Sequence, residues 1–162
     1  HRPVPGKAKD KNTGKERFFQ LLEYISRQSG DCGIKIIIEN ISFSSSCSIN
    51  SYPYTREDFV ELFEKFPGVG FLLDVGHALR NDNLYDLVKM DGKIFELHLH
   101  DIGYKSDNKL SVHLPIKNSE FFDPIKEIVN KNSMAIIFEH GIDVTEEEIL
   151  TEKALLEAVI AN

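Results

Sequence analysis

The chain has 162 residues, 41% of them hydrophobic and 28% charged, and its formal net charge is −7. This composition excludes a disordered chain and suffices for one core of ordinary size, so we expect a single domain. The acidic balance provides no global positive field, which argues against nucleic acid as a partner, although a bound metal could still attract phosphate.

The first elements along the chain are a helix and a buried strand. Apolar residues recur at helical spacing over 18–25, and Gly30 provides a stop. The β-branched run 33–40 is typical of a strand covered on both faces, and it carries Glu39 at its end. The Ser-rich segment 41–54 has no periodicity, which predicts a long βα loop of the kind that often serves function.

A second helix and strand follow this loop. Thr55 and Asp58 have the spacing of an N-cap, and the apolar residues of 59–66 then mark a helix. The run 69–74 predicts the next strand, which ends in Asp74.

The third strand has a strict alternation of polar and apolar residues. A short helix over 81–90 precedes it, and the strand itself covers 94–100. Because alternate side chains point to opposite faces, one face carries three polar residues: Glu96, His98 and His100.

The last part of the chain predicts a helix, a strand and another helix. Ser119 is the expected cap of the first helix, and 135–139 form a strand that ends in Glu139. Thr145 and Glu148 have the spacing of a capping box before the final amphipathic helix. Helices and strands thus alternate throughout, which predicts an α/β fold with a parallel sheet and helical crossovers.

All four predicted strands end in a metal-ligating residue type: Glu39, Asp74, His98 and Glu139. The carboxyl ends of parallel strands line the ligand site in such folds. Any one of these residues could equally be a structural cap, but four buried polar groups together must find a cation or protons. Three carboxylates and one imidazole suit Mn²⁺, Mg²⁺, Co²⁺ or Zn²⁺ and leave the choice of metal open.

Four segments, 36–40, 73–77, 97–101 and 137–139, resemble in this order the motifs of the xylose isomerase-like TIM-barrel superfamily. That superfamily includes sugar and sugar-phosphate isomerases and epimerases, and also the endonuclease IV family. A complete (β/α)₈ barrel usually needs about 250 residues. The resemblance therefore implies a partial barrel of four to five βα units, in which residues 1–162 are the C-terminal portion and the N-terminal strands are missing.

The resemblance also implies roles for the four strand-end residues. Glu39, Asp74, His98 and Glu139 would hold one divalent metal ion. Glu39 and Glu139 would in addition be the catalytic pair, one removing a proton beside a sugar carbonyl and the other returning it. This predicts a metal-dependent sugar or sugar-phosphate isomerase or epimerase that acts on a small carbohydrate.

Two further histidines resemble positions of the superfamily's site. His77 follows Asp74 by three residues, and His113 begins a His-Leu-Pro segment. The resemblance implies that both contact substrate or hold a second metal, whereas the simpler reading of His77 is a loop histidine bonded to backbone. His100 is expected to support the ligands, and Glu96 to be a deeper charge whose partner is not identified.

The sequence departs from the superfamily at several positions. Ser111 replaces an Asp, which argues against a site with three metals, while Lys117 and Ser119 replace two glycines of the same loop. Tyr104 stands where ketose 3-epimerases carry an Arg, so no particular sugar is predicted. His1 could correspond to the superfamily's His-Pro-Gly motif at the end of an earlier strand, or equally be a tag remnant or a frayed end.

Two alternative functions stay open. The first is an endonuclease IV-like metal-dependent phosphodiesterase, favoured by His77 and His113 and opposed by Ser111. The second is an inactive barrel fragment, because four strands leave two open sheet edges that a missing N-terminal half or another copy of the chain would cover.

Cysteine spacing and hydropathy bear on location. Cys32 and Cys47 have neither the spacing of a thiolate zinc site nor the partners of a disulfide scaffold. No apolar run reaches the roughly 18 residues of a membrane span. We therefore expect a cytoplasmic protein.

Overall fold

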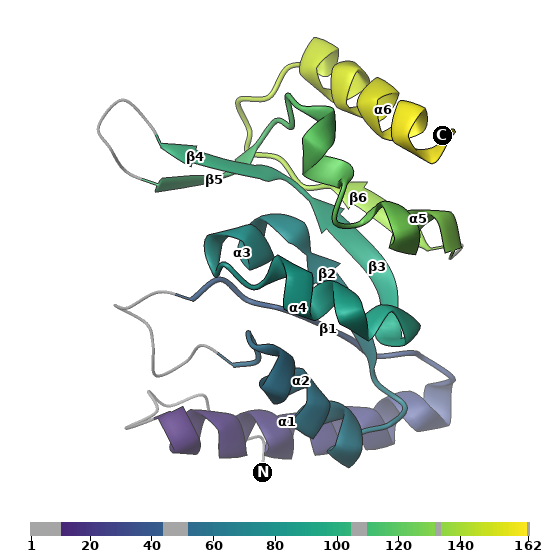
Figure 1. Cartoon of the computed structure of the whole chain (residues 1–162). Helices are drawn as coiled ribbons and strands as arrows, with labels where there is room; N and C mark the ends of the chain where they lie inside the picture. The colour runs from purple at the N-terminus through teal and green to yellow at the C-terminus, as the bar shows by residue number, and fades with distance from the viewer. Residues whose placement is uncertain (1–10, 44–51, 105–109, 132–133, 162) are drawn as a thin grey trace.

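The structure is a computed structural model that describes residues 11–43, 52–104, 110–131 and 134–161 (Figure 1). His1 and residues 44–51 of the predicted loop lie outside the described residues. The elements in chain order are α1 (Lys11–Cys32), β1 (Ile37–Glu39), α2 (Arg56–Lys65), β2 (Gly70–Asp74), α3 (Val75–Arg80), α4 (Leu84–Leu87), η2 (Val88–Lys93), β3 (Ile94–Leu99), β4 (Asp101–Tyr104), β5 (Leu110–Leu114), η3 (Ser119–Phe122), α5 (Lys126–Lys131), β6 (Ala135–Phe138) and α6 (Glu146–Ile160).

The main sheet has four parallel strands in the order β1-β2-β3-β6. Figure 1 shows successive βα units side by side, from α1 and α2 beyond β1 to α5 and α6 beyond β6. In this register Asp74 pairs with His98, and Leu99 pairs with Phe138, one residue before Glu139. The predicted parallel α/β sheet is confirmed, and its register brings the strand ends to one edge.

The core lies between the sheet and the covering helices. Every residue of β2 is buried, and on β3 Leu97 and Leu99 are fully buried while His98 is only partly so. Phe59 of α2 packs on Phe71 of β2 with ring centroids 4.2 Å apart. This packing anchors the strands whose ends carry the site. None of the described helices combines the length and apolar character that crossing a bilayer requires.

Two predicted helix starts are confirmed by reciprocal capping. The Thr55 side chain accepts from the N–H of Asp58, and the Asp58 carboxylate accepts from the N–H of Thr55. Thr145 and Glu148 form the same capping box at the start of α6. Each box satisfies amide groups that a helix start leaves unpaired, so these boundaries follow from local sequence.

The strand predicted over 33–40 is shorter in the structure and begins at Ile37. Gly33 has a φ of 68°, and the N–H of Ile34 donates to the carbonyl of Ser29 at 3.0 Å. These residues therefore complete the end of α1, as glycine in the left-handed region commonly does.

The helix predicted from Ser119 is wrong in two respects. Asn118 is the cap, since its side chain accepts from the N–H of Glu120, and the residues after it form the short 3-10 helix η3. The α-helix α5 begins only at Lys126. Pro124 lies between the two, and it has no N–H that could continue the hydrogen bonds of a helix.

The antiparallel pair β4–β5 is not among the predicted elements. Its register joins Asp101 to Leu114 and Gly103 to Ser111. β5 does alternate apolar and polar residues over Leu110–Leu114, which is a strand signal that the prediction did not use, whereas β4 has only four residues, one of them a glycine. The pair matters for function because β4 starts directly after His100 and β5 carries His113.

Candidate metal centre

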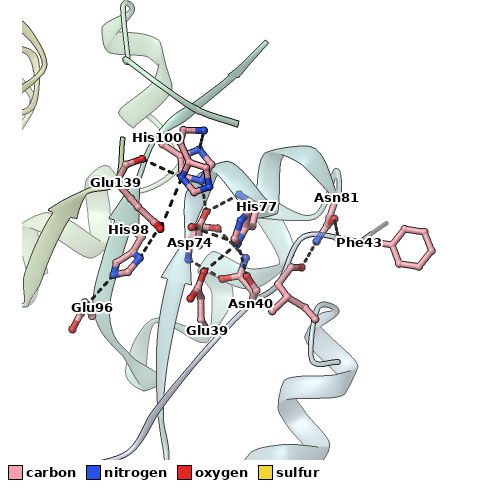
Figure 2. Close-up of polar contacts among 12 residues, drawn as sticks. Glu39, Asn40, Phe43, Asp74, His77, Asn81, Glu96, His98, His100 and Glu139 are labelled. Atoms are coloured by element: carbon pink, nitrogen blue, oxygen red, sulfur yellow. Dashed lines mark hydrogen bonds and ion pairs between the residues drawn. The ribbon is translucent and has the colours of Figure 1, made fainter. Parts of the chain in front are cut away.

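Four polar side chains converge at the carboxyl edge of the sheet. Glu39 ends β1, Asp74 ends β2, His98 lies near the end of β3, and Glu139 follows β6. Each offers one ligand atom, and these atoms all lie within 4.8 Å of one another. Figure 2 shows the side chains pointing toward one another from separate strands. The structure thus brings together all four residues predicted as metal ligands.

Asp74 is the fully buried member of this cluster. Its Oδ1 accepts from the N–H of His77 at 2.6 Å and caps α3. Burial by itself would raise its pKa, but contact with His100 and His77 outweighs burial and lowers the pKa below its usual value. Oδ2 accepts no hydrogen bond from the described residues, although it lies 3.4 Å from Nδ1 of His77. A buried, charged carboxylate with an oxygen that accepts no hydrogen bond is the donor that a bound cation would satisfy.

Asn40 holds Asp74 in place and is absent from the predicted site. Its side chain is fully buried; Nδ2 donates to the carbonyl of Asp74 at 2.9 Å, and Oδ1 accepts from the N–H of Asp74 at 2.8 Å. These two hydrogen bonds link the ends of β1 and β2 (Figure 2). The sequence shows only an amide directly after the strand-end Glu39, and nothing local indicates that this side chain is buried or bonds to Asp74.

His98 lies between two carboxylates. Its Nδ1 is 3.1 Å from Oε2 of Glu139, and its Nε2 is 3.1 Å from Oε1 of Glu96. The partner of Glu96 is therefore His98. With a proton on Nε2 facing Glu96, Nδ1 keeps a lone pair on the side of Glu139. A carboxylate in this outer position orients ligating histidines in many metal sites.

His77 contacts both backbone and side chains. Its Nδ1 lies 3.1 Å from the carbonyl of Asn40 and 3.2 Å from Oε1 of Glu39. Burial lowers its pKa, but the neighbouring carboxylates of Glu39 and Asp74 outweigh burial and raise the pKa above the usual value. The backbone contact expected of a loop histidine is therefore present, and His77 also contacts two of the four predicted ligands, Glu39 and Asp74.

Three histidines, His77, His100 and His113, form a second cluster whose ligand atoms also lie within 4.8 Å of one another. His100 is fully buried; its Nδ1 accepts from the N–H of His113 at 3.0 Å, and its Nε2 lies 3.1 Å from Asp74 Oδ1 without the alignment of a regular hydrogen bond. His113 Nδ1 lies 3.2 Å from the carbonyl of Glu139. The second cluster therefore touches the first at three of its members: Glu39, Asp74 and Glu139.

Gly76 makes room for His100. A Cβ at this position would lie 2.0 Å from Cε1 of the His100 ring, closer than any tolerated contact. Glycine is thus required directly after the strand end, where the ring of His100 approaches the first turn of α3.

We expect Gly76→Ala to destabilise the protein by about 1–3 kcal/mol, the usual range for overpacking, and to weaken metal binding because His100 must leave Asp74. Chemical denaturation and titration with Mn²⁺ measure the two effects. Gly92→Ala is the matched control, because a Cβ there meets no atom within 4 Å. Equal behaviour of the two variants would show that His100 does not need this space.

The positions that depart from the superfamily lie on β4, on β5 and in the segment after β5. Ser111 is in β5 and pairs with Gly103, Lys117 follows β5, and Ser119 begins η3; Lys117 and Ser119 are exposed. Tyr104 ends β4 with 77% of its surface exposed, so it does not line the site. Within the described residues, Ser111 belongs to neither group of candidate ligands.

Comparisons with known proteins agree on one fold. A family model described as xylose isomerase-like TIM barrel matches residues 1–157. A D-psicose 3-epimerase from Clostridium cellulolyticum H10, solved with D-tagatose, has a TM-score of 0.59 and 16% identity, over 97% of this chain and 59% of that chain. An L-ribulose 3-epimerase has a TM-score of 0.57 and 16% identity, over 93% of this chain and 49% of that chain.

A curated relative extends the comparison to sequence. The uncharacterized protein MJ1614 of Methanocaldococcus jannaschii is 29% identical over 80 residues, which are 49% of this chain. The match spans 30% of that relative's length. The structural similarity confirms the predicted α/β fold, a partial (β/α) barrel.

Proposed function

The chain belongs to the xylose isomerase-like TIM-barrel family, and we propose that it is a divalent-metal-dependent sugar or sugar-phosphate isomerase or epimerase. The observation that carries the proposal is the meeting of Glu39, Asp74, His98 and Glu139 at one edge of a parallel sheet. The two solved relatives are named as sugar epimerases, which supports chemistry of this class.

Burial divides the four residues into two pairs. Asp74 is fully buried and the His98 side chain is 17% exposed, so these two are suited to holding an ion at the floor of the site. The side chains of Glu39 and Glu139 are 35% and 41% exposed, which leaves them accessible to a small molecule. The two glutamates are therefore the members that can face both an ion and a substrate.

The proposed reaction is a proton transfer at a carbon next to a carbonyl. One glutamate carboxylate accepts the proton from that carbon, and the other glutamate, as a carboxylic acid, returns a proton to the same or the neighbouring carbon. A divalent ion, when bound, supplies Lewis-acid stabilisation of the oxygen that becomes negative. Glu39 on β1 and Glu139 after β6 lie at opposite ends of the strand order, which suits proton transfer on two sides of a bound substrate.

The donor set fits Mn²⁺, Zn²⁺, Mg²⁺ or Co²⁺ at the four-residue site, with Oδ2 of Asp74 as the buried oxygen that accepts no hydrogen bond from the described part of the chain. A second ion, which the alternative function below requires, would be held at His77 and His113, with His100 beside them. Nδ1 of His77 and Nδ1 of His113 each face a backbone carbonyl, so a proton there leaves Nε2 of each ring with a lone pair.

The three-histidine cluster supports a second candidate function, an endonuclease IV-like phosphodiesterase. Several metal ions close together activate water and steady a phosphate in such enzymes. The acidic chain and Ser111 in place of Asp weigh against this candidate. In the isomerase, His77 and His113 would contact substrate, whereas in the phosphodiesterase they would hold a metal ion. The number of metal ions per chain therefore separates the two functions.

The partner proposed for the polypeptide is an N-terminal half-barrel or a second copy of the chain. Within the part of the chain that the structure describes, no strand pairs with the outer edge of β1 or of β6. Unpaired edges of parallel strands are normally covered. We regard residues 1–162 as the C-terminal portion of one barrel domain that acts in the cytoplasm on a small carbohydrate.

Metal content and a substrate screen test the proposed function together. We expect one Mn²⁺, Zn²⁺, Mg²⁺ or Co²⁺ per chain by elemental analysis, and metal-dependent conversion of a ketose or sugar phosphate. An abasic-site oligonucleotide in the same screen tests the alternative. Two or three ions per chain with cleavage of that oligonucleotide would favour the phosphodiesterase and overturn the isomerase.

A further inference from the structure

Glu152 is a charged residue type buried on the otherwise amphipathic helix α6. It has no exposed surface, although its neighbours Thr151 and Lys153 are exposed. Burying a carboxylate is strongly unfavourable unless the surroundings pair with it. The contacts of Glu152 therefore indicate what this side chain is for.

The Glu152 carboxylate joins two loops. Oε1 accepts from the N–H of Ile116, which is itself buried, and Oε2 lies 2.6 Å from Nε2 of His140, an ion-pair distance without the alignment of a regular hydrogen bond. Ile116 comes three residues after His113, and His140 comes directly after Glu139. We call these two contacts the Glu152 bridge.

The two loops also contact each other. The N–H of Gly141 donates to the carbonyl of His113 at 3.1 Å, and Nδ1 of His113 lies 3.2 Å from the carbonyl of Glu139. The His140 ring stacks on Phe138 with an interplanar angle of 5°. Residues 113–116 and 138–141 thus form one unit, which the Glu152 bridge attaches to α6.

His113 needs such support because its backbone is strained. Its φ is 59°, in the left-handed region that non-glycine residues rarely adopt. Strained positions persist only where several contacts impose them. Glu139 follows the last residue of β6; its N–H still donates to the carbonyl of Leu99 at 3.0 Å, whereas the chain after it has no further pairing with β3 among the described residues.

We propose that Glu152 is a positioning residue that sets the distance between Glu139 and His113, and so the geometry of both candidate metal clusters. This inference rests on the proposed function, in which Glu139 is a ligand and a catalytic group. Glu152 does not touch the reacting atoms. It acts through Ile116 and His140.

The test compares three variants of the whole chain. Glu152→Leu removes both contacts, whereas Glu152→Gln can still accept from Ile116 and can donate to the His140 ring. Leu156→Ala, one turn further along α6, is the stability control, because Leu156 is buried in the core and makes neither contact. All measurements are made well below the thermal midpoint of every variant.

The first readout, amide hydrogen exchange, needs no metal. In Glu152→Leu we expect exchange at Ile116 and Gly141 to accelerate at least about tenfold relative to β2, as local opening of a released segment requires. The second readout is Mn²⁺ affinity. We expect Glu152→Leu to raise the Mn²⁺ Kd by about 10–100-fold, the effect typical of groups that orient ligands. In Glu152→Gln we expect a Kd close to that of the wild-type chain.

Each outcome decides a separate point. Unchanged exchange in Glu152→Leu overturns the bridge, and faster exchange with an unchanged Mn²⁺ Kd overturns the positioning role. Equal loss of Mn²⁺ affinity in Leu156→Ala also overturns that role, because the effect would then be general destabilisation. A wild-type chain that binds no Mn²⁺, Zn²⁺, Mg²⁺ or Co²⁺ contradicts the proposed function and with it the positioning role, while hydrogen exchange still tests the bridge.

A milder variant covers the case in which Glu152→Leu does not fold. His140→Phe keeps a ring over Phe138 and removes the nitrogen that faces Glu152. We expect faster exchange at Gly141 and a weaker Mn²⁺ affinity, both smaller than in Glu152→Leu. An unchanged His140→Phe variant would overturn the proposal.

Discussion

Asp74→Asn is expected to lose more than about 100-fold in affinity for Mn²⁺ or Zn²⁺, and all metal-dependent activity with it. Changes in groups that only orient ligands already cost about 10–100-fold, and this change removes the charge of the most buried donor. Isothermal titration with the metal measures the affinity, and the substrate screen measures the activity.

The substitution is chosen to preserve the fold. Asp74 caps α3 through Oδ1, and Asn is an equally good cap with the same oxygen in place. Asp86→Asn is the matched control, because Asp86 is exposed and pairs with Lys89 away from the site. Full metal binding by a folded Asp74→Asn variant would remove Asp74 from the site.

Glu139→Gln is expected to lower kcat by about 10²–10⁴-fold at saturating metal, the range that general acid–base catalysis contributes. Gln has the shape of Glu but can neither take nor return a proton at neutral pH. Since Glu139 is also a proposed ligand, the metal affinity of the variant must be measured first so that kcat is compared between fully loaded proteins. Glu146→Gln, at the exposed start of α6, serves as the control.

Solvent deuterium distinguishes a two-base reaction from other roles of the glutamates. Glu39→Gln and Glu139→Gln should each stop conversion of the substrate, yet each variant keeps one base. We therefore expect each variant to exchange with solvent the carbon-bound hydrogen of only one of the two epimers. The epimer that exchanges should differ between the two variants. Conversion at the wild-type rate by Glu139→Gln would exclude Glu139 from the mechanism.

The meeting of the four strand ends could be predicted because it depends on two regular features of parallel sheets. Side chains alternate between faces, and parallel strands end at the same edge. The alternation in 94–100 was enough to put Glu96 and His98 on one face, where the structure has them in contact. The histidine cluster was predicted only in part, because alternation can mark 110–114 as a strand but cannot show that it pairs with 101–104 and so brings His113 to His100.

The supporting residues could not be predicted. Asn40 bonds the backbone of Asp74, 34 positions away, and Glu152 bonds the backbone of Ile116, 36 positions away. Gly76 reads as an ordinary turn glycine until the His100 ring is seen against it. Each depends on a close approach between segments whose local sequences carry no information about each other.

The sequence by itself determined the alternation of helices and strands, two capped helix starts and the strand ends that carry Glu39, Asp74, His98 and Glu139. These features depend on periodicity and on contacts within a few residues, which local sequence specifies. Only the tertiary structure decided that the Oδ2 of Asp74 accepts no hydrogen bond from the residues described, that three histidines gather beside it, and that Glu152 contacts two of the loops. The physical reason is that a residue's position in a strand sets the direction of its side chain, whereas its partner depends on how distant loops pack.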